Sequence, residues 1–247
     1  MTSPIVLILG AGAKVGQAVA KAFQAKGYKL ALASRSQDPK TSTGDELHIP
    51  TDCSDTDSVL QAFAKTRSVF GHPNVVIYNG KSTLSLTNHI YSCQVAYDSA
   101  ESDPADIFGL SLDAFKKATT TNLLSAYAAA QEAVKGWKEL PSSSKPTFIY
   151  TGNCENVAPI PILMALGVGK SGAASFIEVG AKSYKDKGYK FYYADERHED
   201  NSPMWKGVNA EGHATLYTEL AEGDEQLEWQ QTFVRGLGYR KLPTPQI

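Results

Sequence analysis

The sequence is poor in cysteine, has no excess of either charge and contains no long apolar run. Its three cysteines, Cys53, Cys93 and Cys154, are odd in number and are not spaced as metal ligands, which argues against a disulfide framework and favours a reducing compartment. With 24 basic and 26 acidic residues the formal net charge is −2, so we expect no nucleic-acid partner. No apolar run reaches the roughly 18 residues of a membrane span, so we expect no membrane partner.

The first residues, MTSPIVLILGAGAKVG, lack the basic region and the small-residue cleavage site of a secretory signal. We therefore expect a cytoplasmic protein. A chain of 247 residues is long enough to bury one sizeable core, and single α/β domains of this length are common. We expect one domain that spans residues 1–247.

Short apolar runs alternate with longer helical patterns over the first 195 residues. Residues 4–10, 14–27 and 28–35 read as a strand, an amphipathic helix and a second strand, which together form a βαβ unit. Further strands are expected at 46–50, 74–79, 146–152 and 189–195, and further helices at 54–70, 112–138 and 162–187. Six strands separated by helices predict an α/β protein with a single doubly wound parallel sheet, a Rossmann fold, and helices on both faces.

Two regions depart from this alternation. Residues 81–110 are polar and irregular, and the pattern becomes unreadable after Asp195. Ligands of doubly wound sheets bind beyond the carboxyl ends of the strands. We therefore expect residues 81–110 and 196–247 to form loops and helices on the substrate side, although they could instead be surface decoration.

A glycine turn, GAGAKVG, follows the first strand at once and opens the first helix. Gly10 permits a tight turn, Gly12 lets the backbone approach a pyrophosphate, and Gly16 allows close helix packing. The N–H groups at the start of a helix favour an anion. The turn, including Lys14 and Val15, therefore predicts a dinucleotide site.

The end of the second strand indicates which dinucleotide is bound. An NAD site usually places a carboxylate there for the ribose 2′-hydroxyl, but this chain has Ser34 and Arg35. A guanidinium binds a 2′-phosphate in bidentate fashion, whereas a carboxylate repels it. The sequence therefore predicts NADP(H), with Lys14 as a second cation beside the phosphate or, equally, as a solvated surface lysine.

The chain resembles the short-chain dehydrogenase/reductase family over about residues 4–195. The resemblance rests on six segments in the family's order: GAGAKVG, TDCSDTDSV, IYNGKS, FKKATTTNLLSAYAAAQEAV, PTFIYTGN and GVGKSGAASF. It implies a nicotinamide cofactor, with Asp52 and Cys53 bordering the adenine and with Asn79 and Gly80 following the fourth strand. The sequence departs from the family at Lys14, which stands at the middle glycine of the turn.

The resemblance also assigns the chemistry. In the family a tyrosine gives a proton to the substrate carbonyl, a lysine four residues later binds the nicotinamide ribose, a serine holds the substrate oxygen and an asparagine anchors a water relay. Asn122 and Lys170 match two of these roles, while Asn153 stands near the serine's place and Leu166 stands in the tyrosine's place. Leucine has no proton to give, and general acid catalysis is typically worth about 10²–10⁴ in rate.

Three interpretations of the missing acid remain open. The first is an NADP(H)-dependent oxidoreductase with a non-standard active site, which transfers hydride to an imine, an iminium or an activated carbonyl of a small organic molecule. The second is a protein that binds NADP(H) without a redox step, and the third is a non-redox catalyst of, for example, a cyclisation. We favour the first, because polar, titratable and aromatic residues crowd the expected pocket: Asn88, His89, Tyr91, Asp195, Arg197, His198, Met204 and Trp205.

Several residues could replace the tyrosine. Asp195 and His198 lie in the charged stretch DERHED, which could supply a proton or could simply be a solvated loop. Asn153 could donate to a substrate or could cap the chain after the fifth strand. Tyr150, Tyr192 and Tyr193 are expected to pack in the core rather than to act as acids: they lie on strands.

The resemblance finally implies an oligomer. Family members commonly pair through the helices matched here by 112–138 and 162–187, which would give a homodimer or a homotetramer. The segment AYAAAQEAV offers small residues that suit close helix packing, although these also suit an interior.

Overall fold

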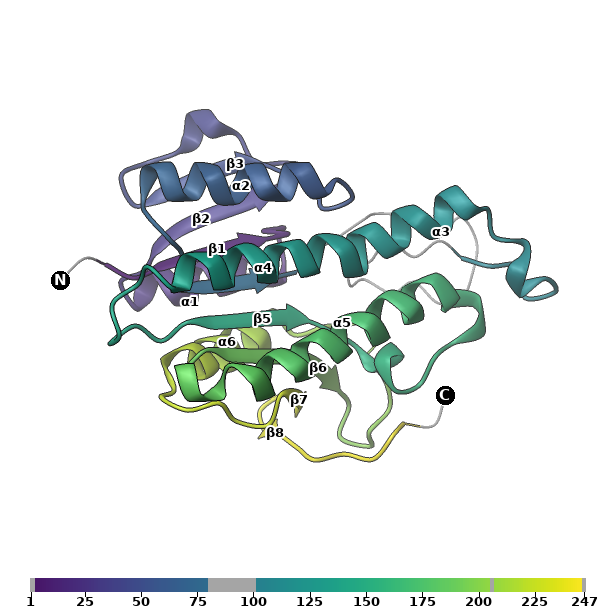
Figure 1. Cartoon of the computed structure of the whole chain (residues 1–247). Coiled ribbons are helices and arrows are strands. Elements are labelled where there is room, and N and C mark those ends of the chain that lie inside the picture. The colour runs from purple at the N-terminus through teal and green to yellow at the C-terminus, as the bar shows by residue number, and fades with distance from the viewer. Residues whose placement is uncertain (1–2, 80–100, 205–206, 246–247) are drawn as a thin grey trace.

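A computed structural model of the chain describes residues 3–79, 101–204 and 207–245. These residues form one eight-stranded sheet in the order β3-β2-β1-β4-β5-β6-β7-β8 (Figure 1). All neighbouring strands from β3 to β7 pair in parallel, and β8 pairs antiparallel with β7. The expected doubly wound parallel sheet is therefore confirmed.

The element bounds agree with the expected pattern through the sixth strand. The strands are β1 (Ile5–Leu9), β2 (Lys29–Ser34), β3 (Glu46–Pro50), β4 (Val75–Tyr78), β5 (Thr147–Thr151), β6 (Lys190–Arg197), β7 (Gln230–Val234) and β8 (Gly238–Tyr239). The helices are α1 (Val15–Ala25), α2 (Thr56–Val69), α3 (Leu112–Thr119), α4 (Ser125–Trp137), α5 (Met164–Ser183) and α6 (Ala210–Glu222).

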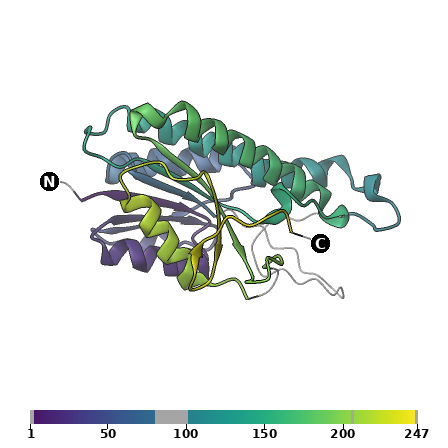
Figure 2. The same cartoon turned by 90° about the horizontal axis from the view of Figure 1, so that it is seen from below.

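Helices cover both faces of the sheet. In Figure 2, α1 and α6 lie on one face and α2, α4 and α5 lie on the other. The central strands β1, β4 and β5 are buried along their whole length, which explains why they read as continuous apolar runs rather than as alternating ones. The carboxyl ends of β1, β4, β5 and β6 therefore meet at one edge of a rigid core.

The helix expected over 112–138 is interrupted. A single π-helical turn, Thr120–Leu124, separates α3 from α4. The extra residue in this turn shifts the backbone hydrogen bonds, and such turns often occur at functional sites. Asn122 lies within it, so the interruption coincides with a residue that the resemblance assigns to the chemistry.

The stretch beyond Asp195, which the sequence pattern left unassigned, completes the sheet. Helix α6 packs against α1, and β7 pairs with β6 from Tyr193 to Arg197. Much of the region 196–247 therefore belongs to the core of the fold and does not form only substrate-side loops.

One expectation about apolar runs is wrong. The segment Pro161–Ser183, which contains α5, is by length and composition apolar enough to cross a membrane. Half of its most apolar window is buried within the fold, and α5 packs against β6. Its composition is therefore that of a core helix of a doubly wound sheet, which also must be apolar.

Candidate functional site

The glycine turn, residues 10–16, has the backbone geometry that its glycines predict. Gly10 adopts a φ of 84°, which residues with a Cβ rarely adopt. The amides of Gly10 and Ala11 both donate to the Ala33 carbonyl, at 2.7 and 3.1 Å. These bonds tie the start of the turn to the end of β2, so that helix α1 begins beside the strand ends.

Two glycines of the turn serve different purposes. A Cβ added to Gly16 would lie 2.7 Å from the Ala11 Cα, so a side chain there would push α1 away from the turn. A Cβ added to Gly12 would meet only the Gly10 carbonyl oxygen, at 4.0 Å. The space over Gly12 is therefore open to a ligand, and Gly16 is required by packing.

Asn79 ties the end of β4 to the same turn. Its Nδ2 donates to the Gly10 carbonyl at 2.9 Å, and its backbone N–H donates to Leu9 at 2.7 Å. The side chain is almost fully buried, so its contribution is to hold the turn rather than to reach into solvent. Gly80, which was assigned to the same site, lies outside the described residues.

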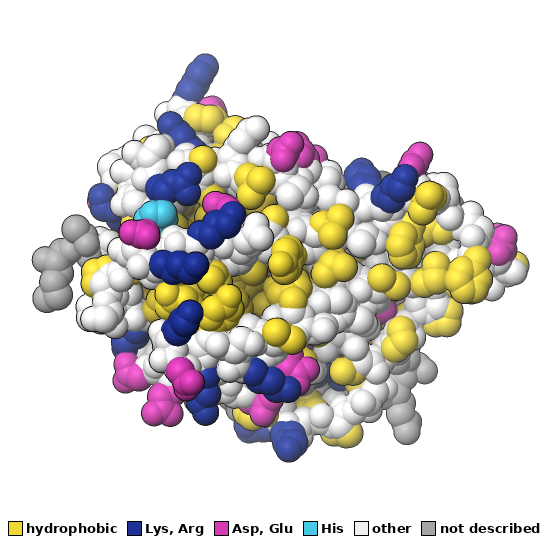
Figure 3. All heavy atoms as spheres, in the orientation of Figure 1, with side chains coloured by type: hydrophobic (Ala, Val, Ile, Leu, Met, Phe, Trp, Pro, Cys, Tyr) yellow, Lys and Arg dark blue, Asp and Glu magenta, His cyan; other side chains and the backbone are white. Residues whose placement is uncertain are grey.

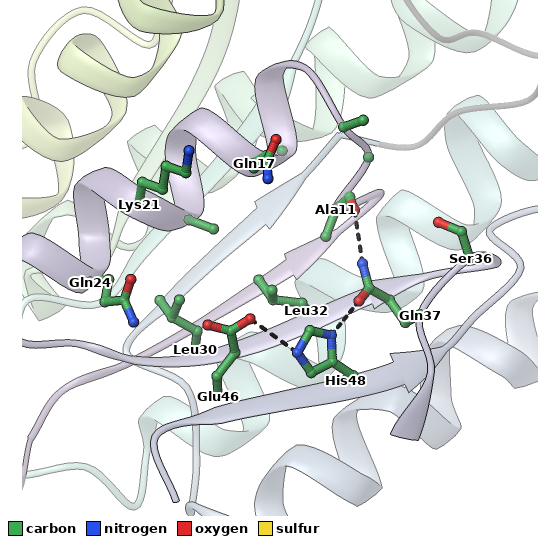
Figure 4. A pocket seen from close by; sticks show the side chains of 14 residues that line it. Ala11, Gln17, Lys21, Gln24, Leu30, Leu32, Ser36, Gln37, Glu46 and His48 are labelled. Atoms are coloured by element: carbon green, nitrogen blue, oxygen red, sulfur yellow. Dashed lines mark hydrogen bonds and ion pairs between the residues drawn. The ribbon is translucent and has the colours of Figure 1, made fainter. Parts of the chain in front are cut away.

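A groove of about 370 Å³ adjoins the turn between α1 and the strands β2 and β3 (Figure 4). The connection between β2 and β3 contains only one short 3₁₀ turn, Pro39–Thr41. Such a connection between parallel strands usually contains a full helix. Because this connection places no helix over the sheet, side chains of α1, β2 and β3 line the groove directly.

Three polar residues link β3 to the glycine turn along this groove. Gln37 donates through Nε2 to the Ala11 carbonyl at 2.9 Å and to Ser34 Oγ at 3.2 Å. Its Oε1 accepts from Nδ1 of His48 at 2.5 Å, and Nε2 of His48 faces the Glu46 carboxylate at 3.0 Å. Sequence reasoning missed this link, although Glu46 and His48 alternate on one face of a strand and could have been noticed.

The predicted adenine end contains a carboxylate between two cations. Burial raises the pKa of Asp52, but hydrogen bonds from Ser54 and the charges of Arg35 and Lys117 outweigh burial, so this pKa is lowered. Arg35 itself is exposed at the end of β2. The thiol of Cys53 is buried and burial raises its pKa to about 12, which leaves only the backbone of Cys53 to border an adenine.

These residues fit a dinucleotide cofactor. The turn offers an open approach over Gly12, the helix start offers N–H groups, and Arg35 and Lys14 are exposed beside it. Val15 is buried under the turn and supports it by packing. The predicted residues of the glycine turn are thus held beside the ends of β2 and β4.

The second part of the site lies at the ends of β5 and β6. Leu166 and Lys170 lie one turn apart on α5, and both are about 1% exposed. Nζ of Lys170 donates to the Thr151 carbonyl at 3.0 Å and lies 4.5 Å from the centre of the Tyr150 ring. The amino group of the lysine thus lies at the carboxyl end of β5.

Asn122 is held rigidly beside this lysine. Its Nδ2 donates to Ala118, and its carbonyl accepts the Tyr150 hydroxyl at 2.8 Å. A Cβ added to Gly169 would lie 2.6 Å from the Asn122 Cβ, so α5 can approach only because residue 169 is a glycine. The π-helical turn therefore positions Asn122 against α5.

Three tyrosines in register form a stack beneath the site. Tyr78, Tyr150 and Tyr193 occupy paired positions on β4, β5 and β6, with ring centres 5.6 and 5.5 Å apart. Each hydroxyl donates to a backbone carbonyl: Thr121, Asn122 and Asn153 respectively. Burial raises the pKa of all three. The expectation that Tyr150 and Tyr193 are packing residues is confirmed, and the fully buried Tyr192 agrees with it.

Asn153 has the capping role, one of the two roles that the sequence left open. Its Oδ1 accepts the Glu155 N–H at 3.2 Å and caps the 3₁₀ turn Cys154–Asn156. Its buried Nδ2 has no hydrogen-bond partner among the described residues. The residue therefore caps the chain with one atom and has a second that is able to donate.

The charged stretch DERHED is not one solvated loop. Asp195 is 1% exposed and Arg197 is 2% exposed, and Nε and Nη2 of Arg197 donate to one Asp195 oxygen at 2.7 and 2.5 Å. Burial raises the pKa of Asp195 against the opposing effects of Arg197 and Lys170. His198, in contrast, is exposed in the turn that follows β6, so the structure separates the two candidate acids.

Sequence reasoning missed two buried glutamates near this end of the sheet. Glu155 is completely buried after β5, and Glu196 is 5% exposed on β6. Burial raises the pKa of each to about 7. Only the three-dimensional structure identifies them, since in sequence both lie in polar stretches.

Other expected site residues lie outside the described chain, namely Asn88, His89, Tyr91 and Trp205, whereas Met204 is half-buried. Within residues 3–79, 101–204 and 207–245, no group of three or more His, Cys, Asp or Glu side chains is arranged to hold a metal ion.

The chain is similar in sequence to known proteins along nearly its whole length. The chain matches the family model for short chain dehydrogenase over residues 4–192. It is 42% identical over 243 residues to the short chain dehydrogenase/reductase dmxR12 of Cryptosporiopsis sp. (strain 8999), which covers 98% of this chain and 96% of that protein.

Solved structures share the fold at lower sequence identity. The 3-ketoacyl-(acyl-carrier-protein) reductase of Brucella melitensis complexed with NADH matches with a TM-score of 0.74 at 16% identity, over 95% of this chain and 98% of that chain. A short-chain dehydrogenase/reductase of Serratia marcescens matches with a TM-score of 0.73 at 17% identity, over 95% and 97% of the two chains.

Proposed function

The chain belongs to the short-chain dehydrogenase/reductase family, and we propose that it is an NADP(H)-dependent oxidoreductase that reduces an imine, an iminium or an activated carbonyl of a small organic molecule. Membership of the family makes the chain an oxidoreductase. We propose in addition its preference for NADP(H), its substrate class and its non-standard active site.

The observation that carries the proposal is the pairing of Lys170 with Leu166 on one face of α5. The lysine is retained at the end of β5, but the residue one turn before it has no proton. Hydride addition to an iminium carbon neutralises a charge that is already present and leaves no oxyanion to protonate. Such a substrate therefore tolerates a leucine at this position.

The residues of the chain would divide the work as follows. The turn around Gly12 would bind the pyrophosphate, and Arg35, with Lys14, would bind the 2′-phosphate. Bound NADP(H) supplies the hydride. Lys170 would hold the nicotinamide ribose, and Leu166 would keep water from the reacting carbon.

Asn153 and Asn122 would complete the polar contacts of the site. The buried Nδ2 of Asn153 has no partner among the described residues, so it is available to donate to the substrate heteroatom. Asn122 would help to position α5, and with it Lys170, because it packs against Gly169.

Arg35→Ala tests the cofactor assignment. Losing charge-assisted hydrogen bonds worth about 1.5–3 kcal/mol should weaken NADPH binding by about 10- to 100-fold and leave NADH binding unchanged. Titration by nicotinamide fluorescence measures both constants. Lys40→Ala, an exposed cation of the same connection, should change neither. Equal affinities of the unmutated protein for NADPH and NADH would contradict the assignment.

We also propose a compartment and an oligomeric state for the protein. The buried free thiols of Cys53 and Cys154 suit a reducing, cytoplasmic compartment. Figure 3 shows hydrophobic side chains along the face formed by α4 and α5. Tyr127 on α4 and Val168 on α5 are exposed, as is Leu124 in the π-helical turn before α4. We assign this face to a homodimer or homotetramer interface, and sedimentation would measure the assembly.

A further inference from the structure

Glu155 is an ionisable residue that the proposed function has not used. It follows β5 by four residues and is completely buried. Enclosing an ionised carboxylate without a matched cation is costly, so a fully buried glutamate requires a reason. Ligands of doubly wound sheets bind at this edge, which places the carboxyl beside the proposed substrate pocket.

The two carboxyl oxygens of Glu155 have different surroundings. Oε2 accepts the backbone N–H of Ile160 at 3.1 Å. Oε1 is buried and has no hydrogen-bond partner among the described residues. An oxygen that accepts an N–H is a poor place for a proton, so a protonated Glu155 carries its proton on Oε1.

Helix α5 is shaped around this carboxyl. A Cβ added to Gly167 would lie 3.1 Å from Glu155 Oε2, and Gly167 directly follows Leu166. The glycine leaves room for the carboxyl at the turn of α5 where the leucine replaces a phenol. The carboxyl of Glu155 therefore packs against α5 at the residue that directly follows Leu166.

The charged groups around Glu155 come from two elements. Lys170 faces it from α5, while Asp195 and Arg197 of β6 act on the adjacent Cys154. Burial raises the pKa of Glu155 to about 7, against the lowering effects of the Ile160 N–H and Lys170. A general acid is most effective when its pKa lies near the working pH.

We propose that Glu155 is a catalytic residue that supplies the proton in place of the missing tyrosine when the substrate is a carbonyl. This inference rests on the proposed function. As the hydride supplied by bound NADPH forms a C–H bond at the carbonyl carbon, the π electrons of the C=O bond move to oxygen. That oxygen takes the proton from Oε1, giving an alcohol, oxidised cofactor and an ionised Glu155. Solvent then returns a proton to the carboxylate.

The assignment predicts a proton linkage that needs no substrate. The oxidised nicotinamide ring is positively charged and the reduced ring is neutral. A positive charge within about 4–6 Å lowers a carboxyl pKa by about 1–3 units. At pH 7 the binding of NADP⁺ should therefore release roughly 0.4–0.5 proton more than the binding of NADPH.

Isothermal titration calorimetry in buffers of different ionisation enthalpy measures this difference. The unmutated protein should show it, and Glu155→Gln should abolish it while still binding both cofactors. Glu155→Asp, which keeps the acid, should retain a difference with a shifted pH midpoint. Thermal unfolding of each variant reports whether it is folded.

Glu196→Gln is the matched control. Burial also raises the pKa of Glu196 to about 7, its Oε2 accepts the Asn209 N–H at 2.9 Å, and its Oε1 lacks a partner among the described residues. Glu196 belongs to β6, but its carboxylate lies at the start of α6 beside His213, so this variant should keep the full proton difference.

The outcomes separate the two proposals. If the unmutated protein binds NADPH but shows no difference, or if Glu155→Gln retains it, the role of Glu155 is refuted and the proposed function stands. If neither cofactor binds the unmutated protein, both proposals fall.

Discussion

The ends of β1 and β2 and the ends of β5 and β6 use charge in opposite ways. At the first pair the backbone forms the site, and the cations Lys14 and Arg35 are exposed around it. At the second pair the charged side chains Glu155, Lys170, Asp195 and Arg197 are all buried. Exposed charges contribute little to stability and can be specialised for a ligand, whereas buried charges are coupled to folding itself.

The ends of β1 and β2, the cofactor end, and the ends of β5 and β6, the chemical end, also differ in which residues can be replaced. The cofactor end depends on glycines and backbone hydrogen bonds, which tolerate few replacements. At the chemical end, Leu166 stands where the family resemblance predicts a phenol, and polar atoms of Glu155, Asp195 and Asn153 have no hydrogen-bond partner among the described residues. A site of this kind can hold a different set of proton-bearing groups on an unchanged scaffold.

The largest expected effect comes from restoring the family's phenol. In the Glu155→Gln variant, which lacks the proposed replacement acid, Leu166→Tyr should raise ketone reduction by about 10²–10⁴-fold, because residue 166 lies one turn before Lys170. Turnover of simple ketones with NADPH measures the gain. Leu166→Phe, which adds the ring without the hydroxyl, should show none. An unchanged rate in Leu166→Tyr with intact NADPH binding would mean that the two ends differ by more than one acid.

Breaking the buried ion pair between Arg197 and Asp195 should destabilise the protein. Arg197→Ala leaves Asp195 buried without its partner and should lower the free energy of unfolding by about 3–5 kcal/mol. Urea denaturation measures this loss. Arg35→Ala, the corresponding change at the exposed end, should stay within about 0.5 kcal/mol of the unmutated protein. Similar losses in the two variants would remove the contrast between exposed and buried charge.

Two glycine variants separate packing from binding at the cofactor end. Gly16→Ala places a Cβ 2.7 Å from the Ala11 Cα and should cost about 1–3 kcal/mol of stability as well as NADPH affinity. Gly12→Ala meets only the Gly10 oxygen at 4.0 Å, so it should keep its stability and lose NADPH affinity alone. Thermal unfolding and NADPH titration of both variants test the distinction, and a stable Gly16→Ala would disprove the packing role.

The smallest expected effect is a change in how stability depends on pH. Burial raises the pKa of Glu196 from 4.5 to about 7, so the folded protein keeps a proton that the unfolded chain releases between these values. Stability from this group is complete below about pH 4.5 and is lost as the pH rises through about 7. Glu196→Gln should therefore gain on the order of 1 kcal/mol relative to the unmutated protein between pH 5 and pH 8.

Urea unfolding at the two pH values measures that gain. Burial lowers the pKa of the neighbouring His213 to about 4, which has the opposite sign: its folded form loses stability as the pH falls from about 6.5 toward 4. The comparison of variants at each pH cancels this contribution. Glu199→Gln, a change at an exposed residue, should leave the slope unaltered, and an unaltered slope in Glu196→Gln would contradict the buried assignment.

Local sequence patterns are sufficient to predict the first six strands of the sheet and the glycine turn. Apolar strands with both faces covered, a glycine turn between strand and helix, and Arg35 at a strand end are local patterns, and their consequences follow from residues near one another in the chain. The tertiary structure alone decided the chemical end. Whether DERHED is solvated, whether Tyr150 can donate to a ligand, and whether Glu155 is buried all depend on contacts between β5, β6 and α5. Burial shifts the pKa of an ionisable group. It depends on how the whole molecule packs around that group and not on the residues next to the group in the sequence.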